Sequence, residues 1–331
     1  MSKLVETGHP AYTKFFSPVS KEITPVKWLL KGVMEENSIN GLFGPSGEKK
    51  SFVVIDMALH ILNGKDWYGH KVKQKDVTVL YIAGEGAAGI NLRVNAACKH
   101  HNLSSERFFV SNSSVDMMDT ETVVDLVDMV KSVEGPVWVI LDTLNRNFAG
   151  DENSSKDMAM LWKNIDMLRS VGATFTMVHH TGHGSTDRAR GSSSIKGAMD
   201  GEIRVSTDGK TGQTTVTNTK NKNVGNSSEI LLESLSVSFG KDEDGDNITS
   251  LAMITSKKKV VDSSVTLDIV AKELNELLPM TQSEIDVLIA SKLDVSESTA
   301  AKKKKPLIKE ILINKFGMLI VNKQWVKGVS K

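Results

Sequence analysis

The sequence predicts an α/β fold in which a mainly parallel sheet is flanked by helices, carries an antiparallel extension and is followed by a small C-terminal domain. Three observations predict this fold. Short apolar runs rich in β-branched residues alternate with segments of helical periodicity through the first half of the chain. A loop rich in glycine joins the first of these runs to a helix. Polar residues follow several of the runs, where parallel strands would end.

The apolar runs have the composition of strands that are buried on both faces of a parallel sheet. They are Ile39–Phe43, Val77–Ala83, Phe108–Val110, Pro136–Asp142 and Ala173–Val178. The segments between them predict helices from Ser51 to about Asn63, up to about His101, over Thr120–Val133 and over Ser154–Ser170. Because such strands are joined by right-handed crossovers, we expect all of them to end at one edge of the sheet.

The segment from Gly201 to Thr255 has a different sequence pattern, in which short runs of alternating apolar and polar residues are separated by Asp-Gly-type turns. Such runs predict antiparallel strands that extend the sheet. The runs are Ile203–Val205, Thr214–Thr219, Leu231–Leu232, Leu235–Phe239 and Leu251–Thr255.

We therefore divide the chain into an N-terminal arm (residues 1–24), a core (25–258) and a C-terminal domain (265–331). In the last part, helix, helix and hairpin follow one another, an order typical of a winged helix. The expected elements are a helix over Val265–Leu278, a helix from the capping box at Thr281 to Ser291, a helix after Ser296 and a hairpin over Gly317–Val326.

Composition limits the classes of function. The formal net charge is only +1, so contacts with nucleic acid would come from local patches such as Lys257–Lys259 or Lys302–Lys305, which are otherwise solvated faces. No apolar run is long enough to span a membrane, and the N-terminus lacks a signal-peptide pattern. Cys98 is the only cysteine, which excludes a disulfide framework or a cysteine-rich metal site. We expect a cytoplasmic protein without a membrane partner.

The stretch GLFGPSGEKKSFVVID, Gly41 to Asp56, is typical of a phosphate-binding P-loop, with a polar turn as the alternative. The pattern G-x-x-x-x-G-K-[ST] is met at Gly44, Lys50 and Ser51, but Lys49 stands at the second glycine. Lys49 fits only if its backbone angles are open to a non-glycine residue and its side chain points outward. The expected nucleotide contacts are Gly44, Pro45, Ser46, Gly47, Glu48, Lys49, Lys50, Ser51 and Phe52.

Residues at the strand ends supply the remaining chemistry of an ATPase. Lys50 would bridge the β- and γ-phosphates, while Ser51 and Asp142, a Walker B acid, would hold Mg²⁺. Glu85 lies between two glycines after a strand and is the candidate general base. The alternatives are a helix-capping role for Asp142 and a solvated turn for Glu85.

Histidines follow the last parallel strand, at His179, His180 and His183. Three imidazoles at this spacing would suit zinc, but no fourth strong ligand is nearby. We favour a histidine that senses the γ-phosphate and relays nucleotide state to the loop over 182–191.

Four cationic residues follow the expected parallel strands in the sequence: Arg188, Arg190, Lys220 and Lys222. Such residues are either solvated or reach the nucleotide of a neighbouring subunit.

Seven motifs occur in one order: GPSGEKKSF, GKDWYGH, YIAGEGAAGI, WVILDTLNR, VHHTG, RARGSSSIKGAMD and TKNKNVG. From about Pro25 to Gly225 the chain thereby resembles the RepA-like (AAA_25) branch of RecA-fold ATPases, hexameric replicative helicases of plasmids and phages. The family often has a bulkier residue at the second P-loop glycine. The resemblance implies a RecA-like core and homo-oligomeric rings, with the hexamer as the expected size, nucleotide between subunits and single-stranded DNA in the channel.

The resemblance also carries roles to individual residues. It implies roles for Lys50, Ser51, Glu85, Asp142, and His179 or His180, and it leaves the cation supplied in trans open among Arg190, Arg204, Lys220 and Lys222.

The leading hypothesis is an ATP-dependent replicative helicase that translocates on single-stranded DNA, with ATP and Mg²⁺ as cofactors. Its further partners would be origin DNA, an initiator or a primase. One alternative is a nucleotide-gated DNA-binding initiator, loader or regulator, which the C-terminal domain would suit. Another is a RecA-like recombination factor, which would form filaments rather than closed rings.

Overall fold

The computed structural model divides the chain into two units, Met1–Ser256 and Lys257–Lys331. The residues described in the first unit are 23, 25–84, 86–181, 197–223 and 229–256; those in the second are 280–281, 283, 286–287, 312–315 and 318–321. Among these residues, no helix has the length and apolar character needed to cross a membrane. The division into an arm, a core over 25–258 and a domain over 265–331 stays a prediction.

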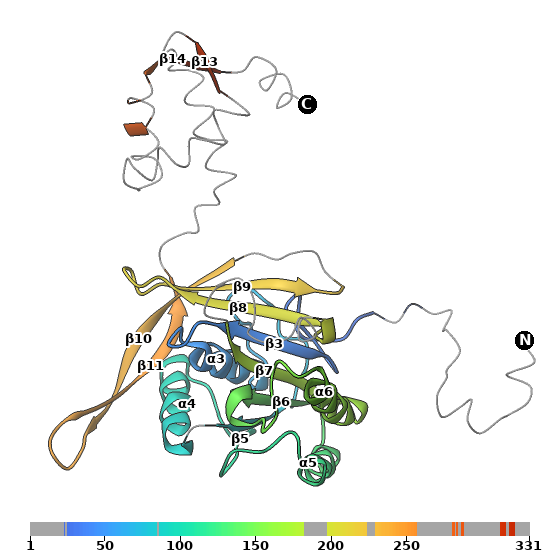
Figure 1. Ribbon diagram of the computed structural model, residues 1–331. Helices are drawn as coiled ribbons and strands as arrows, with labels where there is room; N and C mark the ends of the chain where they lie inside the picture. Colours follow the sequence, from blue (N-terminus) through green and yellow to red (C-terminus); the bar gives the residue numbers. More distant parts are fainter. Residues whose placement is uncertain are drawn as a thin grey trace, which may run out of the picture. The chain divides into compact units, whose positions relative to one another are not determined.

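A nine-stranded sheet forms the centre of the first unit, in the order β11-β10-β9-β8-β3-β7-β6-β4-β5 (Figure 1). The strands from β8 to β5 in this order run parallel to one another. Their bounds are β8 (Gly201–Thr207), β3 (Ile39–Gly44), β7 (Thr174–His180), β6 (Val137–Asp142), β4 (Thr78–Ala83) and β5 (Phe108–Val110). The mainly parallel sheet expected from the sequence is therefore confirmed.

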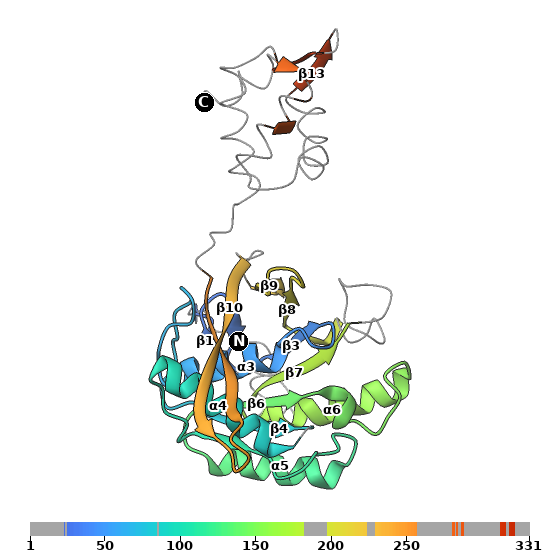
Figure 2. The same ribbon diagram turned by 90° about the vertical axis from the view of Figure 1, so that its left-hand side faces the viewer.

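Helices cover both faces of the parallel strands (Figure 2). Alternate side chains of a strand point to opposite faces, so Val79 and Tyr81 of β4 join one core while Leu80 and Ile82 join the other. The first core contains α3 (Lys50–Leu62) and α4 (Ala87–His101); the second contains α5 (Thr120–Ser132), α6 (Ser155–Ser170) and the 3₁₀ turn η1 (Leu144–Arg146).

The ends of these helices follow local sequence signals. Asp119 caps α5 by accepting a hydrogen bond from the Glu121 amide, and Ser154 caps α6 by accepting one from the Asp157 amide. Both caps satisfy backbone donors that a helix leaves unpaired at its first turn. In contrast, α3 follows Lys49 without any side-chain cap. Its first turn therefore has amide groups open to an anion.

The antiparallel extension consists of β9 (Thr214–Asn221), β10 (Glu229–Lys241) and β11 (Asn247–Thr255). One expectation about it, that β8 is an antiparallel strand, holds on one side only, and another was wrong. β8 pairs in parallel with β3 on one side and antiparallel with β9 on the other, because the chain passes from β7 to β8 across β3. The two short runs at 231–232 and 235–239 form one strand, because the polar residues between them pair with β11.

The β10–β11 hairpin lies against α4 (Figure 1). The Lys99 amine donates to the Ser238 carbonyl over 2.8 Å. A second short ribbon, β1 (Trp28–Leu30) with β2 (Met34–Glu35), precedes the sheet and was not expected from the sequence. Leu29 and Leu30 anchor that ribbon in the core, because both are fully buried.

In the C-terminal unit, β12 (Met280–Thr281), β14 (Met318–Val321) and β13 (Leu312–Lys315) form a sheet in that order. The hairpin therefore begins before residue 317, where the sequence placed its start. Thr281 ends β12, and the described residues of the helix expected after its capping box, Ser283, Asp286 and Val287, are helical. The helices expected at 265–278 and after Ser296 lie outside the described residues, so the winged helix stays a prediction.

Candidate nucleotide-binding site

The P-loop connects the end of β3 to the start of α3 at the carboxyl edge of the parallel strands. Gly44 begins the loop beside β8, where an added β-carbon would collide with the Val205 carbonyl oxygen. No larger residue fits there unless β8 moves. The backbone amides of the loop and of the first turn of α3 then form the positive pole of a helix, which attracts phosphate.

Lys49 takes the left-handed conformation that a P-loop glycine would take, with φ 59° and ψ 22°. Its side chain leaves the loop, and the amine donates to the Gly212 carbonyl (3.0 Å) and to the Ser234 hydroxyl (3.1 Å). Both conditions for a lysine at this position are met, since the backbone adopts the required angles and the amine points toward β9 and β10.

Lys50 points the other way, into the site, and is only 5% exposed. Its amine donates to the carbonyls of Gly44 (3.0 Å) and Pro45 (2.7 Å) and lies 3.2 Å from His180 Nδ1. Burial lowers the pKa of the amine, and the negative charges of Asp142 and Glu48 oppose that shift. The amine is therefore held at the mouth of the loop by carbonyl oxygens, which a phosphate can replace.

Asp142 ends β6 and is held by a tyrosine from the neighbouring strand. The Tyr81 hydroxyl donates a hydrogen bond to Asp142 Oδ2 and also interacts with the Ser51 hydroxyl. Burial, together with the charge of Asp142 and this hydrogen bond, raises the pKa of Tyr81 well above its usual value. Tyr81 thus remains a proton donor and links Ser51 to Asp142. In the sequence it is one more residue of an apolar strand, so sequence reasoning missed it.

The structure separates the two strand-end histidines. His180 pairs with Gly44 across the β3–β7 ladder and faces Lys50. His179 is 2% exposed and lies on the opposite side, with Nε2 3.8 Å from the Glu152 carboxylate. Burial, then the charges of Lys50 and His179, lower the pKa of His180. His180 is therefore the histidine that contacts the site; His183 lies outside the described residues.

These residues surround a pocket of about 440 Å³. The Arg93 guanidinium lies over the Phe52 ring at 5.0 Å, a cation–π contact between α4 and α3. Helical spacing alone could not show that Arg93 faces the loop. The lining residues are Ser46, Gly47, Glu48, Lys49, Lys50, Ser51, Phe52, Ile90, Arg93, Asp142, Thr143, Asn145, Arg146 and His180.

The Glu48 side chain is engaged outside the pocket. Its carboxylate accepts a hydrogen bond from the Thr207 amide at the end of β8. Glu48 therefore fixes the loop against the sheet, while the residue still lines the pocket with the rest of the loop.

The lysines expected to act in trans lie near the ends of the parallel strands that are opposite to the P-loop. Lys220 donates to the Met199 carbonyl over 2.7 Å, and Lys222 pairs with Asp200 over 2.8 Å. Lys220 lies on β9 and Lys222 directly follows β9, beside the start of β8, whereas the P-loop follows the end of β3. Arg204 lies on β8 itself and is half-buried. Arg188, Arg190 and Glu85 lie outside the described residues.

The donor set of the pocket suits Mg²⁺. The Ser51 hydroxyl and the Asp142 carboxylate are hard oxygen ligands, which magnesium prefers. Asp142 is 6% exposed and its Oδ2 is fixed by Tyr81, so its remaining lone pairs are oriented before any ion binds.

Comparison with known proteins identifies the family. Residues 10–186, more than half of the chain, match the AAA domain family AAA_25. The chain belongs to that family. It is therefore a P-loop NTPase with a RecA-like core and binds a nucleotide. The resemblance drawn from the motifs is confirmed at this level.

Solved structures give more distant likenesses to this AAA_25 chain. The RadB recombinase is 13% identical, with a TM-score of 0.45 over 60% of this chain and 87% of that chain. The KaiC-like protein PH0186 from Pyrococcus horikoshii OT3 is 15% identical, with a TM-score of 0.45 over 65% and 95%. A third structure, of an ATPase domain, is 11% identical, with a TM-score of 0.46 over 64% and 84%. A comparison with curated proteins gives no match.

Proposed function

We propose that this protein is an ATP-dependent DNA helicase, a ring-forming replicative motor of a plasmid, phage or related mobile element. The observation that carries the proposal is the convergence of Lys50, Asp142 and His180 on one pocket at the carboxyl edge of the sheet. Three groups from three different strand ends form a site for a polyphosphate. Membership of AAA_25 supports the nucleotide chemistry, and the motif resemblance supports the helicase.

In the proposed reaction the P-loop amides and the Lys50 amine bind the β- and γ-phosphates of ATP. Mg²⁺, when bound, neutralises developing charge on the phosphate oxygens. Ser51 and Asp142 supply its protein ligands, and Tyr81 keeps the Asp142 carboxylate in place. Arg93, above the Phe52 ring, adds a positive charge on the α4 side of the pocket.

Glu85 is the proposed general base. In the sequence it follows β4, which lies beside β6 in the sheet, so β4 ends at the same edge as the strand that carries Asp142. Its role is to orient a water molecule toward the γ-phosphate and to accept a proton from that water.

His180 is the proposed sensor of the γ-phosphate. Its Nδ1 accepts from the Lys50 amine at 3.2 Å, so a phosphate that attracts Lys50 competes for the same donor. Release of His180 then changes the start of the segment that follows β7. That segment includes Arg190, a candidate to reach a neighbour's nucleotide.

The proposed quaternary arrangement is a homo-oligomeric ring, with a hexamer the expected size, around single-stranded DNA. A cation from one subunit would complete the site of the next. Lys220 and Lys222 can serve in this way only if they leave Met199 and Asp200. Arg190, which lies outside the described residues, and Arg204 remain candidates beside them.

The experiment measures ATP hydrolysis and strand separation of a forked duplex by the whole protein. Lys50→Ala should abolish nucleotide binding, while Glu85→Gln should keep binding and lower turnover about 10²–10⁴-fold. Lys131→Ala and Glu121→Gln, both on the surface of α5, are matched controls and should behave like wild type. Wild-type turnover by Glu85→Gln would move the base elsewhere. Hydrolysis with DNA binding but without strand separation would favour the initiator, loader or recombination alternatives.

A further inference from the structure

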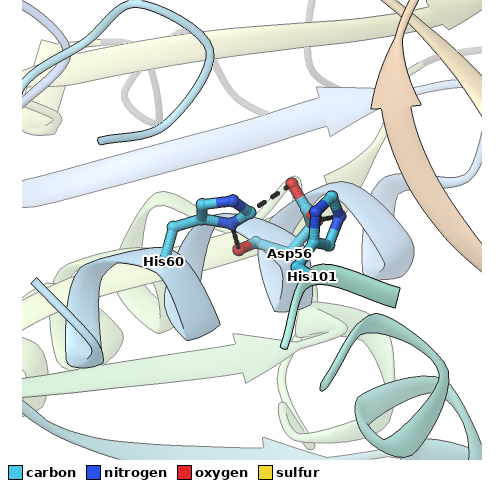
Figure 3. Close-up of side chains that lie close together, drawn as sticks. All are labelled: Asp56, His60 and His101. Atoms are coloured by element: carbon cyan, nitrogen blue, oxygen red, sulfur yellow. Dashed lines mark hydrogen bonds and ion pairs between the residues drawn. The ribbon is translucent and has the colours of Figure 1, made fainter. Parts of the chain in front are cut away.

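A cluster of two imidazoles and a carboxylate lies along the far half of the P-loop helix (Figure 3). Asp56 and His60 come from α3, and His101 is the last residue of α4. Nitrogen and oxygen atoms of the three side chains all lie within 4.8 Å of one another. Asp56 is 1% exposed and His60 is 8% exposed, so the cluster is largely withdrawn from solvent.

The fold brings these residues together from two helices. Asp56 and His60 are four residues apart and therefore share one face of α3. α4 packs against that face and ends in His101, whose ring stands edge-on to the His60 ring at 4.8 Å. β11 closes the cluster with the carbonyl of Met253, 2.8 Å from His101 Nε2.

The Asp56 carboxylate has two unlike oxygens. Oδ2 accepts a hydrogen bond from the Trp67 indole over 2.8 Å, which fixes the orientation of the carboxylate. Oδ1 is buried and lies 3.0 Å from His101 Nε2, which also contacts the Met253 carbonyl. The Met253 carbonyl accepts a further hydrogen bond from the Tyr68 hydroxyl. A buried carboxylate is unfavourable without a positive charge beside it. A cation bound among the three side chains supplies that charge, whereas an imidazole supplies it only when protonated.

We propose that Asp56, His60 and His101 form a binding site for a divalent transition-metal ion, of which zinc fits best. Two imidazole nitrogens and one carboxylate oxygen are typical zinc ligands, whereas magnesium and calcium prefer oxygen alone. His101 Nε2 lies 3.0 Å from Asp56 Oδ1, and His60 Nδ1 lies 3.8 Å from Asp56 Oδ2. These distances lie on either side of the roughly 3.4 Å between ligands of a tetrahedral zinc ion.

The neighbours of the cluster complete the coordination. The Trp67 indole donates a hydrogen bond to the Asp56 carboxylate and orients it, as hydrogen bonds to metal ligands commonly do. The Met253 carbonyl or a water molecule supplies a fourth ligand. His60 Nδ1 and His101 Nε2 each exchange their present hydrogen bond, to the carbonyls of Asp56 (2.8 Å) and Met253 (2.8 Å), for the metal, because a ligating imidazole nitrogen must present a lone pair.

The position of the cluster gives the ion a role distinct from that of catalytic Mg²⁺. Asp56 is six residues after Lys50 on the same helix, roughly 9 Å along its axis. An ion held by α3 and α4 ties the helix that carries the P-loop to the helix that carries Arg93. The ion stabilises the packing of α3 against α4 and takes no part in the reaction.

The first test uses untagged wild-type protein, stripped with a chelator and without nucleotide. Calorimetric titration with Zn²⁺ should show that each chain binds one equivalent of zinc with high affinity. The melting temperature should rise by about 5–10 °C when free Zn²⁺ exceeds Kd about a hundredfold. Co²⁺ should compete and give the visible absorption of a low-symmetry nitrogen and oxygen site, while Mg²⁺ should cause no shift. Absence of a tight equivalent at micromolar Zn²⁺ would overturn the proposal.

Substitutions of the proposed ligands test where the zinc binds. Asp56→Asn, His60→Gln and His101→Gln should each abolish the tight binding of zinc. Circular dichroism and thermal melting establish that each variant is folded. His100→Gln is the matched control, because His100 is the exposed neighbour of His101, and Cys98→Ser excludes a thiol ligand. Retention of the equivalent by any two folded ligand variants, or its loss in His100→Gln or Cys98→Ser, would show that the ion binds elsewhere.

Discussion

At the scale of single residues, Lys49 shows how one position can serve the loop without contacting phosphate. A non-glycine residue in the left-handed region is disfavoured by about 1–2 kcal/mol. The structure offsets this with two hydrogen bonds from the amine to Gly212 and Ser234. The loop keeps its shape, and the amine binds it to the antiparallel extension.

Replacing Lys49 with glycine or with alanine separates these two effects. Both changes remove the amine, but only alanine retains the β-carbon at φ 59°. We expect Lys49→Gly to be more stable than Lys49→Ala by about 1 kcal/mol in denaturant unfolding, and its ATPase activity to stay within a few-fold of wild type. A loss of activity comparable to that of Lys50→Ala would mean that Lys49 does contact phosphate.

His180 makes stability depend on pH. Burial and the charges of Lys50 and His179 hold its pKa below the value of about 6.5 expected for the unfolded chain. Below that pH the unfolded chain binds a proton first, so folding stability falls as the pH falls toward the folded pKa. Above about pH 6.5, His180 is neutral in both the folded and the unfolded chain, and its contribution to the free energy of unfolding is fully present.

The matched variant is His180→Gln, whose amide oxygen can still accept from Lys50 but does not titrate. The free energy of unfolding of wild type relative to this variant should be larger at about pH 7.5 than at about pH 5.5. Equal differences at both pH values would show that His180 titrates alike in the folded and unfolded chains.

At the scale of elements, the close approach of β3 and β8 fixes where the P-loop begins. Gly44 leaves no room for a β-carbon beside the Val205 carbonyl. We expect Gly44→Ala to destabilise the protein by about 1–3 kcal/mol and to weaken nucleotide binding, because β8 must shift. Denaturant unfolding and nucleotide titration measure both effects.

Gly89 provides the control for that substitution. It lies in the first turns of α4, and an added β-carbon there meets no atom within 4 Å. Gly89→Ala should leave stability unchanged or raise it by up to about 1 kcal/mol, since alanine favours helix. If both alanine variants lose stability equally, steric contact with Val205 is not the cause.

The start of β8 is held by a separate set of contacts. Asp200 accepts from the Ile39 amide over 2.9 Å and pairs with Lys222. Burial would raise the pKa of its carboxyl, but the Ile39 hydrogen bond and Lys222 together keep that pKa lower than usual. These contacts explain why Lys222 has a role within its own subunit.

At the scale of the whole molecule, the shared-site proposal predicts that activity depends on assembly. Specific ATPase activity should rise with protein concentration and with added single-stranded DNA, because a cation supplied by a neighbour can contribute about 10³–10⁵ in kcat. Activity that is independent of concentration down to isolated monomers would exclude a shared site.

Mixing experiments identify the subunit that donates the cation. Lys50→Ala subunits keep their cations but lack a working site, and Arg190→Ala subunits have the opposite defect. Mixtures should recover part of the turnover if Arg190 acts in trans. The same test with Lys220→Ala/Lys222→Ala checks the lysines, and unfolding of that variant alone measures the loss of their contacts to Met199 and Asp200. No recovery in mixed rings would exclude the residue tested.

The sequence by itself determined the parts of this protein that depend on local pattern. Continuous apolar runs predicted the parallel strands from β3 to β7, and the spacing of Gly44, Lys50 and Ser51 predicted the P-loop. The acid at the end of β6 followed from the same patterns, because the end of a parallel strand is visible in the sequence and its edge is shared by its neighbours.

Tertiary structure alone decided which side chains meet. Adjacent residues in a strand face opposite sides, and only the position of β7 beside β3 places His180 rather than His179 against Lys50. The bond from Tyr81 to Asp142 needed the register of β4 with β6. The meeting of Asp56 with His101 needed α4 to pack on α3. These contacts join residues far apart in the chain, so they depend on how elements pack and not on local sequence pattern.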